Sequence, residues 1–175
     1  MVATPLRISV YESEELQAVL TAMRNLDKTT KKWIRQETRT QSLPIWQDEV
    51  RGHVTTALET RVLSDTARVQ PSDQNVQLRS ASSVARMRGG GTPAALAHAT
   101  EFGANRAEER TYERRTRSGR MATVRRHTQR QFKPVNRGGY VVYPAAAQAI
   151  PRLASLWAQT VARAAHDAME GHEDG

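Results

Sequence analysis

Apolar residues in the first part of the chain recur three or four positions apart, the spacing of one helix face. Six polar residues at 27–32 interrupt this stripe. The pattern predicts a long helix over about 13–41, with Ser13 as its N-cap, that either bends at the interruption or rests its second half on another subunit. The apolar stripe consists of Leu16, Leu20, Met23, Leu26, Trp33 and Ile34.

A second helix of about 18 residues is predicted to restart at Ser42. Pro44 then falls close to the first helical position, where its missing N–H has no intrahelical partner to lose. The expected buried face repeats at every fourth residue and consists of Trp46, Val50, Val54, Leu58 and Val62.

Short alternating segments predict a small antiparallel sheet. Residues 67–70 and 76–79 flank a turn-forming stretch at 71–75, and Leu6, Ile8 and Val10 alternate within an expected strand or extended arm at 1–12. A last strand is predicted at Tyr140-Val141-Val142-Tyr143, ended by Pro144.

Two further helices are predicted from capping signals. Thr92 and Pro93 resemble an N-cap and first residue of a short helix that ends at Gly103. The final helix is expected from about Ile150 to Met169, with Pro151 in its first turn. Its inward face is expected to contain Leu153, Trp157, Val161, Ala164 and Ala168.

These elements predict an α+β fold with two long N-terminal helices, a small antiparallel β-sheet and a C-terminal helix. The chain is expected to form a single domain. Residues 1–103 and 140–170 build that domain, a long extended basic arm is inserted at 104–139, and 171–175 form a disordered tail.

Charge distinguishes the basic arm from the rest of the chain. Between Asn105 and Tyr140 lie ten arginines, one lysine and three glutamates, an excess of eight that equals the net charge of the whole protein, +8. Such a stretch buries too little apolar surface to order itself, so we expect it to become ordered on a partner. The candidate contact residues are Arg114, Arg115, Arg117, Arg120, Arg125, Arg126 and Arg130.

Three interpretations of the basic arm stay open. Its arginines could pair with acidic patches on sister subunits or a neighbouring ring, hold DNA phosphates, or lie in a solvated loop. Tyr112 and Phe132 are too few aromatics to stack along a single strand, and no recognition helix is present. Any DNA contact should therefore be independent of sequence and sensitive to salt.

Patterns for other chemistry are weak. The chain has no cysteine, and Gly89-Gly90-Gly91 lacks the lysine of a phosphate-binding loop. His98 with Glu101, and His166 with Glu170, have helical spacing but no further metal-ligand partner. We expect no enzyme activity, no catalytic, cofactor or metal site, no membrane contact and no small-molecule substrate.

The order of the elements and three short motifs resemble the tail-completion or head–tail-joining proteins of long-tailed bacteriophages, in a version similar to those of actinobacteriophages. The motifs are Glu101-Phe102-Gly103, the segment Tyr140 to Ala145 with Tyr143 and Pro144, and the run Ile150 to Trp157. The basic arm departs from the family, which has a compact loop after its E-F-G element, and Phe132-Lys133-Pro134 matches a further family segment only loosely.

The resemblance implies a structural virion protein that forms a ring, commonly hexameric, in the phage neck, present in the host cytoplasm during assembly. The implied partners are sister subunits and adjacent neck and tail rings, with possible non-specific contact to double-stranded DNA in the lumen. The resemblance does not separate head completion from tail completion or tail termination. The alternative is a basic, non-specific DNA-binding or packaging accessory protein.

Overall fold

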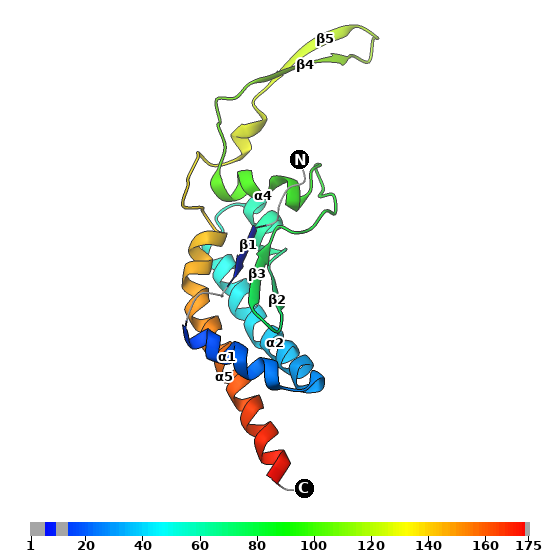
Figure 1. Cartoon of the computed structure of the whole chain (residues 1–175). Helices are drawn as coiled ribbons and strands as arrows, with labels where there is room; N and C mark the ends of the chain where they lie inside the picture. Colours follow the sequence, from blue (N-terminus) through cyan, green and yellow to red (C-terminus); the bar gives the residue numbers. More distant parts are fainter. Residues whose placement is uncertain (1–5, 10–13, 174–175) are drawn as a thin grey trace.

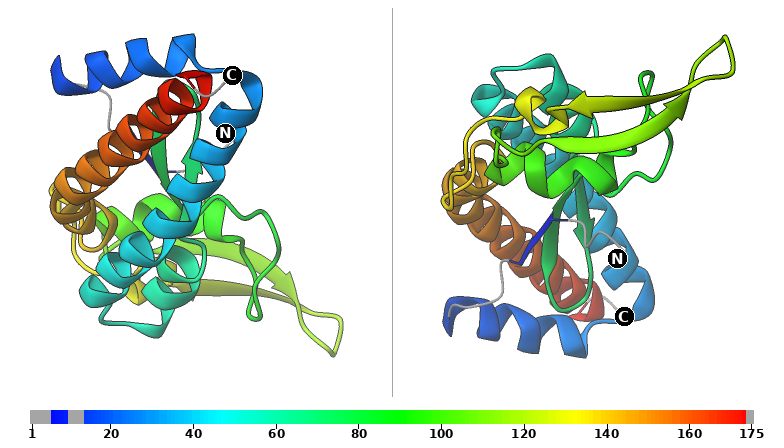
Figure 2. Two further views of the ribbon diagram at one scale, coloured as in Figure 1. Left: turned by 90° about the horizontal axis from the view of Figure 1, so that it is seen from below. Right: turned by 90° about the horizontal axis from the view of Figure 1, so that it is seen from above.

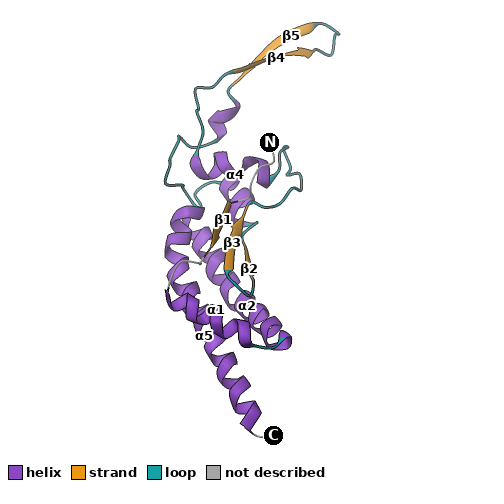
Figure 3. Cartoon of the chain, viewed as in Figure 1, coloured by secondary structure: helices purple, strands orange, loops and turns teal. Residues whose placement is uncertain are grey.

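The computed structural model describes residues 6–9 and 14–173, with side chains described for 17–169. The described chain is elongated (Figure 1). Long helices and a small sheet form its main body, and a β-hairpin projects from the end opposite the C-terminus (Figures 1 and 3). The α+β class, the long N-terminal helices, the small antiparallel sheet and the C-terminal helix agree with the sequence prediction.

The first predicted helix is two helices, α1 (Glu14–Asn25) and α2 (Lys28–His53). The break falls within the polar interruption, where the Asp27 carboxylate caps α2 by accepting hydrogen bonds from the backbone N–H of Thr29 at 2.7 Å and of Thr30 at 3.0 Å. These hydrogen bonds, with that from the Thr30 hydroxyl the largest influence, lower the pKa of Asp27. The predicted cap Ser13 lies outside the described residues.

The predicted helix start at Ser42 is wrong, because α2 continues through Pro44 without a break. A fully buried stripe at four-residue spacing crosses the proline, so packing outweighs the one backbone hydrogen bond that Pro44 removes. Two members of this stripe are polar, so a pattern of apolar residues alone does not reveal it. The stripe consists of Ile34, Thr38, Ser42, Trp46 and Val50.

Three antiparallel strands form the core sheet in the order β1-β3-β2. They are β1 (Leu6–Ser9), β2 (Arg68–Pro71) and β3 (Val76–Ser80), which confirms the predicted strand pair and the strand near the N-terminus. Val10 lies outside the described residues. The sheet is reached from α2 through α3 (Ala57–Glu59) and one π-helical turn, Thr60–Ser64.

The largest correction concerns α5, a single helix over Val142–Glu173. The predicted strand at Tyr140–Tyr143 and the predicted helix start at Ile150 are wrong, and Pro151 lies inside the helix. Helix α5 packs along α2 and is crossed by α1 (Figure 2). The expected disordered tail is helical as far as Glu173, and 174–175 lie outside the described residues. The buried residues of α5 include Leu153, Trp157, Val161 and Ala164, as predicted, whereas Ala168 is half-buried.

Trp46 of α2 and Trp157 of α5 are the largest buried side chains described, with 0% and 1% of their surfaces exposed. The Trp46 indole N–H donates to the backbone carbonyl of Arg79 at 3.2 Å, which ties α2 to β3. A short helix, α4 (Pro93–Phe102), lies toward the hairpin end of the molecule (Figure 1). It begins at Thr92, whose side chain accepts from the backbone N–H of Ala95, and ends at Gly103, as predicted.

Candidate interaction surface on the basic hairpin

The basic arm contains an antiparallel hairpin, β4 (Arg110–Arg115) and β5 (Met121–Arg126), which the sequence analysis did not predict. All six residues of β4 are exposed to solvent. A two-stranded hairpin that buries so little apolar surface is at best marginally stable alone. The geometry therefore supports an element that gains stability from a partner.

A tight turn closes the hairpin tip. The backbone N–H of Thr116 donates to the carbonyl of Arg120 at 2.8 Å, and that of Gly119 donates to the carbonyl of Thr116 at 2.9 Å. Gly119 has φ +84°, a conformation that only glycine adopts at little cost. The turn places Arg117 and Arg120 at the extreme end of the hairpin.

Strand register divides the hairpin into two different faces, because residues directly opposite each other share a face. Tyr112 is opposite Val124 and Glu113 is opposite Thr123. The face with Tyr112 has three arginines and no acid, whereas the face with Glu113 has two arginines and one acid. The first face consists of Arg110, Tyr112, Arg114, Ala122, Val124 and Arg126, and the second of Thr111, Glu113, Arg115, Met121, Thr123 and Arg125.

Arg110 and Arg126 are directly opposite each other on the acid-free face. Like charges in a cross-strand pair destabilise a sheet. Glu108 offsets the charge of Arg110 alone, so an anion bound at Arg126 would offset the remaining charge. With the half-exposed ring of Tyr112 beside them, this face is suited to phosphates or carboxylates that bring some apolar surface.

Acidic partners lie at the base of the hairpin. Glu108 accepts from Arg110 at 3.1 Å, and Glu109 lies 3.5 Å from Arg125 and 3.7 Å from the His127 ring. The guanidinium of Arg115 donates to the Gly119 carbonyl. The remaining candidate contact arginines make no side-chain hydrogen bond or ion pair with the described residues, namely Arg114, Arg117, Arg120, Arg126 and Arg130.

The basic arm is anchored to the main body by the ion pair between Lys133 and Glu59, with Nζ and Oε1 2.5 Å apart. The ammonium group also lies 4.6 Å from the ring centre of Tyr140, whose hydroxyl donates to the Pro134 carbonyl at 2.9 Å. Burial opposes ionisation of Glu59, but Lys133 and the Thr55 backbone N–H together lower the pKa of this carboxyl. The anchor is therefore a charged pair at neutral pH.

Glu101 holds the two ends of the basic arm together. Its fully buried carboxylate accepts hydrogen bonds from the backbone N–H groups of Val141, Val142 and Tyr143, at 2.8 to 3.3 Å. These are the free amides at the start of α5, and Pro144 contributes none. The carboxylate thereby begins a helix at residues that the sequence pattern assigned to a strand. The Glu101-Phe102-Gly103 motif therefore contacts the start of α5.

Two glycines allow this close approach. A Cβ on Gly103 would lie 1.9 Å from the Pro134 carbonyl oxygen, and one on Gly139 would lie 2.3 Å from Glu101 Oε1. Both glycines also have φ near +75°, which disfavours any side chain. The sequence predicted Gly103 as a helix end. In the structure Gly103 also lies so close to the Pro134 carbonyl that no side chain fits there.

Aromatic side chains beside this junction remain accessible. The Phe102 ring lies 5.1 Å from the His98 ring and 5.2 Å from the Tyr143 ring, between centroids. Tyr143 is 46% exposed, whereas Trp157 is buried far along α5. The structure therefore brings Glu101, Phe102, Gly103, Tyr140, Tyr143 and Pro144 together and leaves Trp157 in the core.

Sequence reasoning missed Glu59, Lys133 and Gly139 as anchors. One signal was available for Glu59, because Thr56 and Glu59 have the spacing of a capping box and form one here. No sequence signal identified its pairing with Lys133, which lies on the far side of the basic arm.

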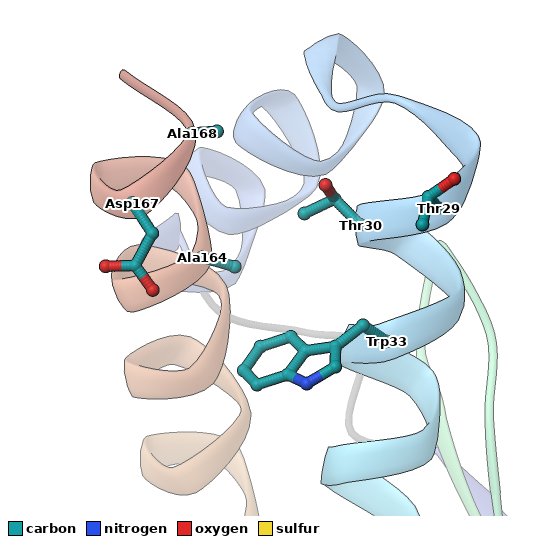
Figure 4. A pocket seen from close by; sticks show the side chains of 6 residues that line it. All are labelled: Thr29, Thr30, Trp33, Ala164, Asp167 and Ala168. Carbon is teal, nitrogen blue, oxygen red and sulfur yellow. The ribbon is translucent and has the colours of Figure 1, made fainter. Parts of the chain in front are cut away.

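Trp33, predicted to be in the buried stripe, is instead 46% exposed. It lies between the start of α2 and the end of α5, in a groove of about 380 Å³ (Figure 4). Apolar and polar side chains both line this groove. Its lining residues are Thr29, Thr30, Trp33, Ala164, Asp167 and Ala168.

No cluster of three potential metal ligands occurs among the described residues. Within the same part of the chain, no helix is long and apolar enough to cross a membrane. Comparison with protein-family models, curated proteins and solved structures found no match to this chain.

Proposed function

We propose that this protein is a structural subunit of a bacteriophage neck, which assembles into a hexameric ring that joins or completes the tail at the head–tail interface. The proposal rests mainly on the hairpin β4–β5. It is exposed along the whole of β4, rich in unpaired arginines and anchored by buried contacts. These features suit an element completed by an adjoining subunit or ring.

The anchoring supports this interpretation over a simple solvated loop. A loop without a role needs no fixed direction, yet Glu101, Lys133 and Gly103 all hold the ends of the basic arm. A firm base lets the hairpin present its arginines in a fixed position without the full entropy cost of ordering on contact.

The remaining support is the resemblance of the element order and of Glu101-Phe102-Gly103 to tail-completion proteins. The buried carboxylate of Glu101 and the contacts of Gly103 give these residues a structural reason to occur together. The Glu101 carboxylate is fully buried and both of its oxygens accept backbone N–H groups, so we propose no catalytic role for it.

The experiment is a deletion of this gene in the particle whose genome encodes it, followed by electron microscopy of lysates. The proposal expects DNA-filled heads and separate tails that fail to join, rescued by the wild-type gene. A variant in which Arg110 is linked to Arg126 by a short glycine–serine segment should give partial or no rescue. Normal joined particles without the protein would refute the proposal.

A second function is favoured by Arg114 and Arg126 on the acid-free face, which have no ion-pair partner among the described residues and are free to bind DNA phosphates. In this alternative, the chain is a non-specific DNA-binding or packaging accessory protein. Tight binding to a duplex of about 20 base pairs that weakens at least about a hundredfold between 50 and 200 mM salt would support it. The same measurement on the hairpin-deleted variant should then show no binding.

A further inference from the structure

A pocket of about 460 Å³ lies beside the glycine loop at residues 89–91. We call it the glycine-loop pocket. Its apolar lining comes from the half-buried side chains of Leu58, Met87 and Leu96. Arg61 and Arg88 also line it, and neither guanidinium has a hydrogen-bond or ion-pair partner among the described residues. A pocket of this kind accepts an apolar side chain accompanied by carboxylates.

The end of α5 has the complementary chemistry. Its last turns extend past α1 and α2, at the opposite end of the molecule from α4 and the hairpin (Figure 1). Met169 on these turns is 68% exposed. From position 164 to the last residue the chain has four acids and no lysine or arginine.

Helix α5 continues past Met169 to Glu173, so two acids of the sequence, Glu170 and Glu173, fall within its last turn. Acids at the C-terminal end of a helix repel its negative dipole end, so a cationic partner would stabilise them. The glycine-loop pocket is complementary to the end of α5, because it offers an apolar cavity for Met169 and two unpaired arginines for the acids.

We propose that the end of α5 from one copy docks into the glycine-loop pocket of the next copy. Met169 enters between Leu58, Met87 and Leu96, and the adjacent carboxylates pair with Arg61 and Arg88. The two surfaces differ and lie at opposite ends of the chain, so the contact is head-to-tail. Such a contact closes a ring when its rotation permits. This inference rests on the proposed ring function and names the interface that would form the ring.

Two variants test the contact by sedimentation velocity. The pocket variant is Arg61→Ser with Arg88→Ser, and the tail variant is Met169→Ser with Glu170→Ser and Glu173→Ser. Wild type should associate as concentration rises, and each variant alone should associate at least about tenfold more weakly. An equal mixture should form a dimer and stop there, because only one intact contact is possible between the two variants.

The matched control is Lys28→Ser with Lys32→Ser, which removes the same charge as the pocket variant from two exposed positions of α2. It should associate like wild type, and all variants should keep the wild-type unfolding midpoint. A mixture that forms no dimer, or a control that loses association equally, would overturn the contact.

Wild type that remains monomeric at about 1 mM, a concentration at which even weak contacts are half occupied, would also overturn it. That result would leave the neck function standing, since a neck subunit can be ordered by the adjoining ring. Failure of the gene-deletion experiment, with head-to-tail association intact, would instead reject the neck function alone.

Discussion

The Glu101 carboxylate accepts a hydrogen bond from the backbone N–H of Val142 at 2.8 Å, although 41 positions separate the two residues. This bond joins the end of α4 to the start of α5 and closes the base of the basic arm. It explains how an exposed, charged insertion is held without disturbing the core.

Replacing Glu101 should destabilise the fold strongly. Both carboxylate oxygens accept backbone N–H groups, so the amide NH2 of Glu101→Gln would oppose a donor with a donor. We expect a loss of about 2–3 kcal/mol in the free energy of unfolding, measured with urea. Glu113→Gln, on the exposed hairpin, should change it by less than about 0.5 kcal/mol. Equal effects of the two substitutions would contradict the junction described here.

Gly103→Ala should cost at least about 2 kcal/mol, because its Cβ would collide with the Pro134 carbonyl and its φ is positive. Gly52 is a matched control, since a Cβ there meets nothing within 4 Å and the residue lies in α2. Gly52→Ala should stabilise the protein by up to about 1 kcal/mol. The two thermal midpoints should therefore move in opposite directions.

Trp157 and Trp33 should behave differently when truncated. Trp157→Ala removes a fully buried side chain from α5 and should cost about 3–5 kcal/mol. Trp33 is nearly half exposed, so Trp33→Ala should cost no more than about 1 kcal/mol in the isolated chain. A small effect at Trp157 would mean that its face of α5 is not packed in the monomer.

The Glu59–Lys133 ion pair should make stability depend on pH. Because the native pKa of Glu59 is lowered, its stabilisation is complete above the ordinary carboxyl pKa and is lost as pH falls through the native value. The difference in unfolding free energy between wild type and Glu59→Gln should thus be largest near neutral pH and shrink below pH 4 or so. A difference that stays constant from pH 7 to pH 3, measured by denaturant unfolding at each pH, would exclude an ionised Glu59.

Hydrogen exchange should separate the hairpin from the core. In the isolated chain, the backbone amides of Tyr112 and Val124 should exchange fast, since the hairpin strands that carry them bury little surface against the rest of the protein. The amide of Trp157 should exchange only through global unfolding. Strong protection of the hairpin without any partner would contradict its proposed dependence on one.

Local sequence patterns predicted most helices and strands of the main body, but few of the contacts that join elements distant in the sequence. Alternation predicted the core strands, and Thr92, Pro93 and Gly103 predicted α4, because the forces involved act within a few residues. The continuity of α2 through Pro44 depends on burial against α5, which no local signal reports. Likewise, the start of α5 at Val142 depends on a carboxylate donated from α4. The basic arm was predicted as extended, but its hairpin register was not, since charged residues obscure the alternation.

If the proposal holds, the gene belongs to a bacteriophage, and the most direct test is cryo-electron microscopy of that phage at a resolution that traces side chains in its neck. The account predicts a closed ring of this fold between head and tail, with hairpin arginines in contact with another subunit, an adjoining ring or DNA. A neck without this protein, or a ring whose hairpins extend into solvent, would contradict it.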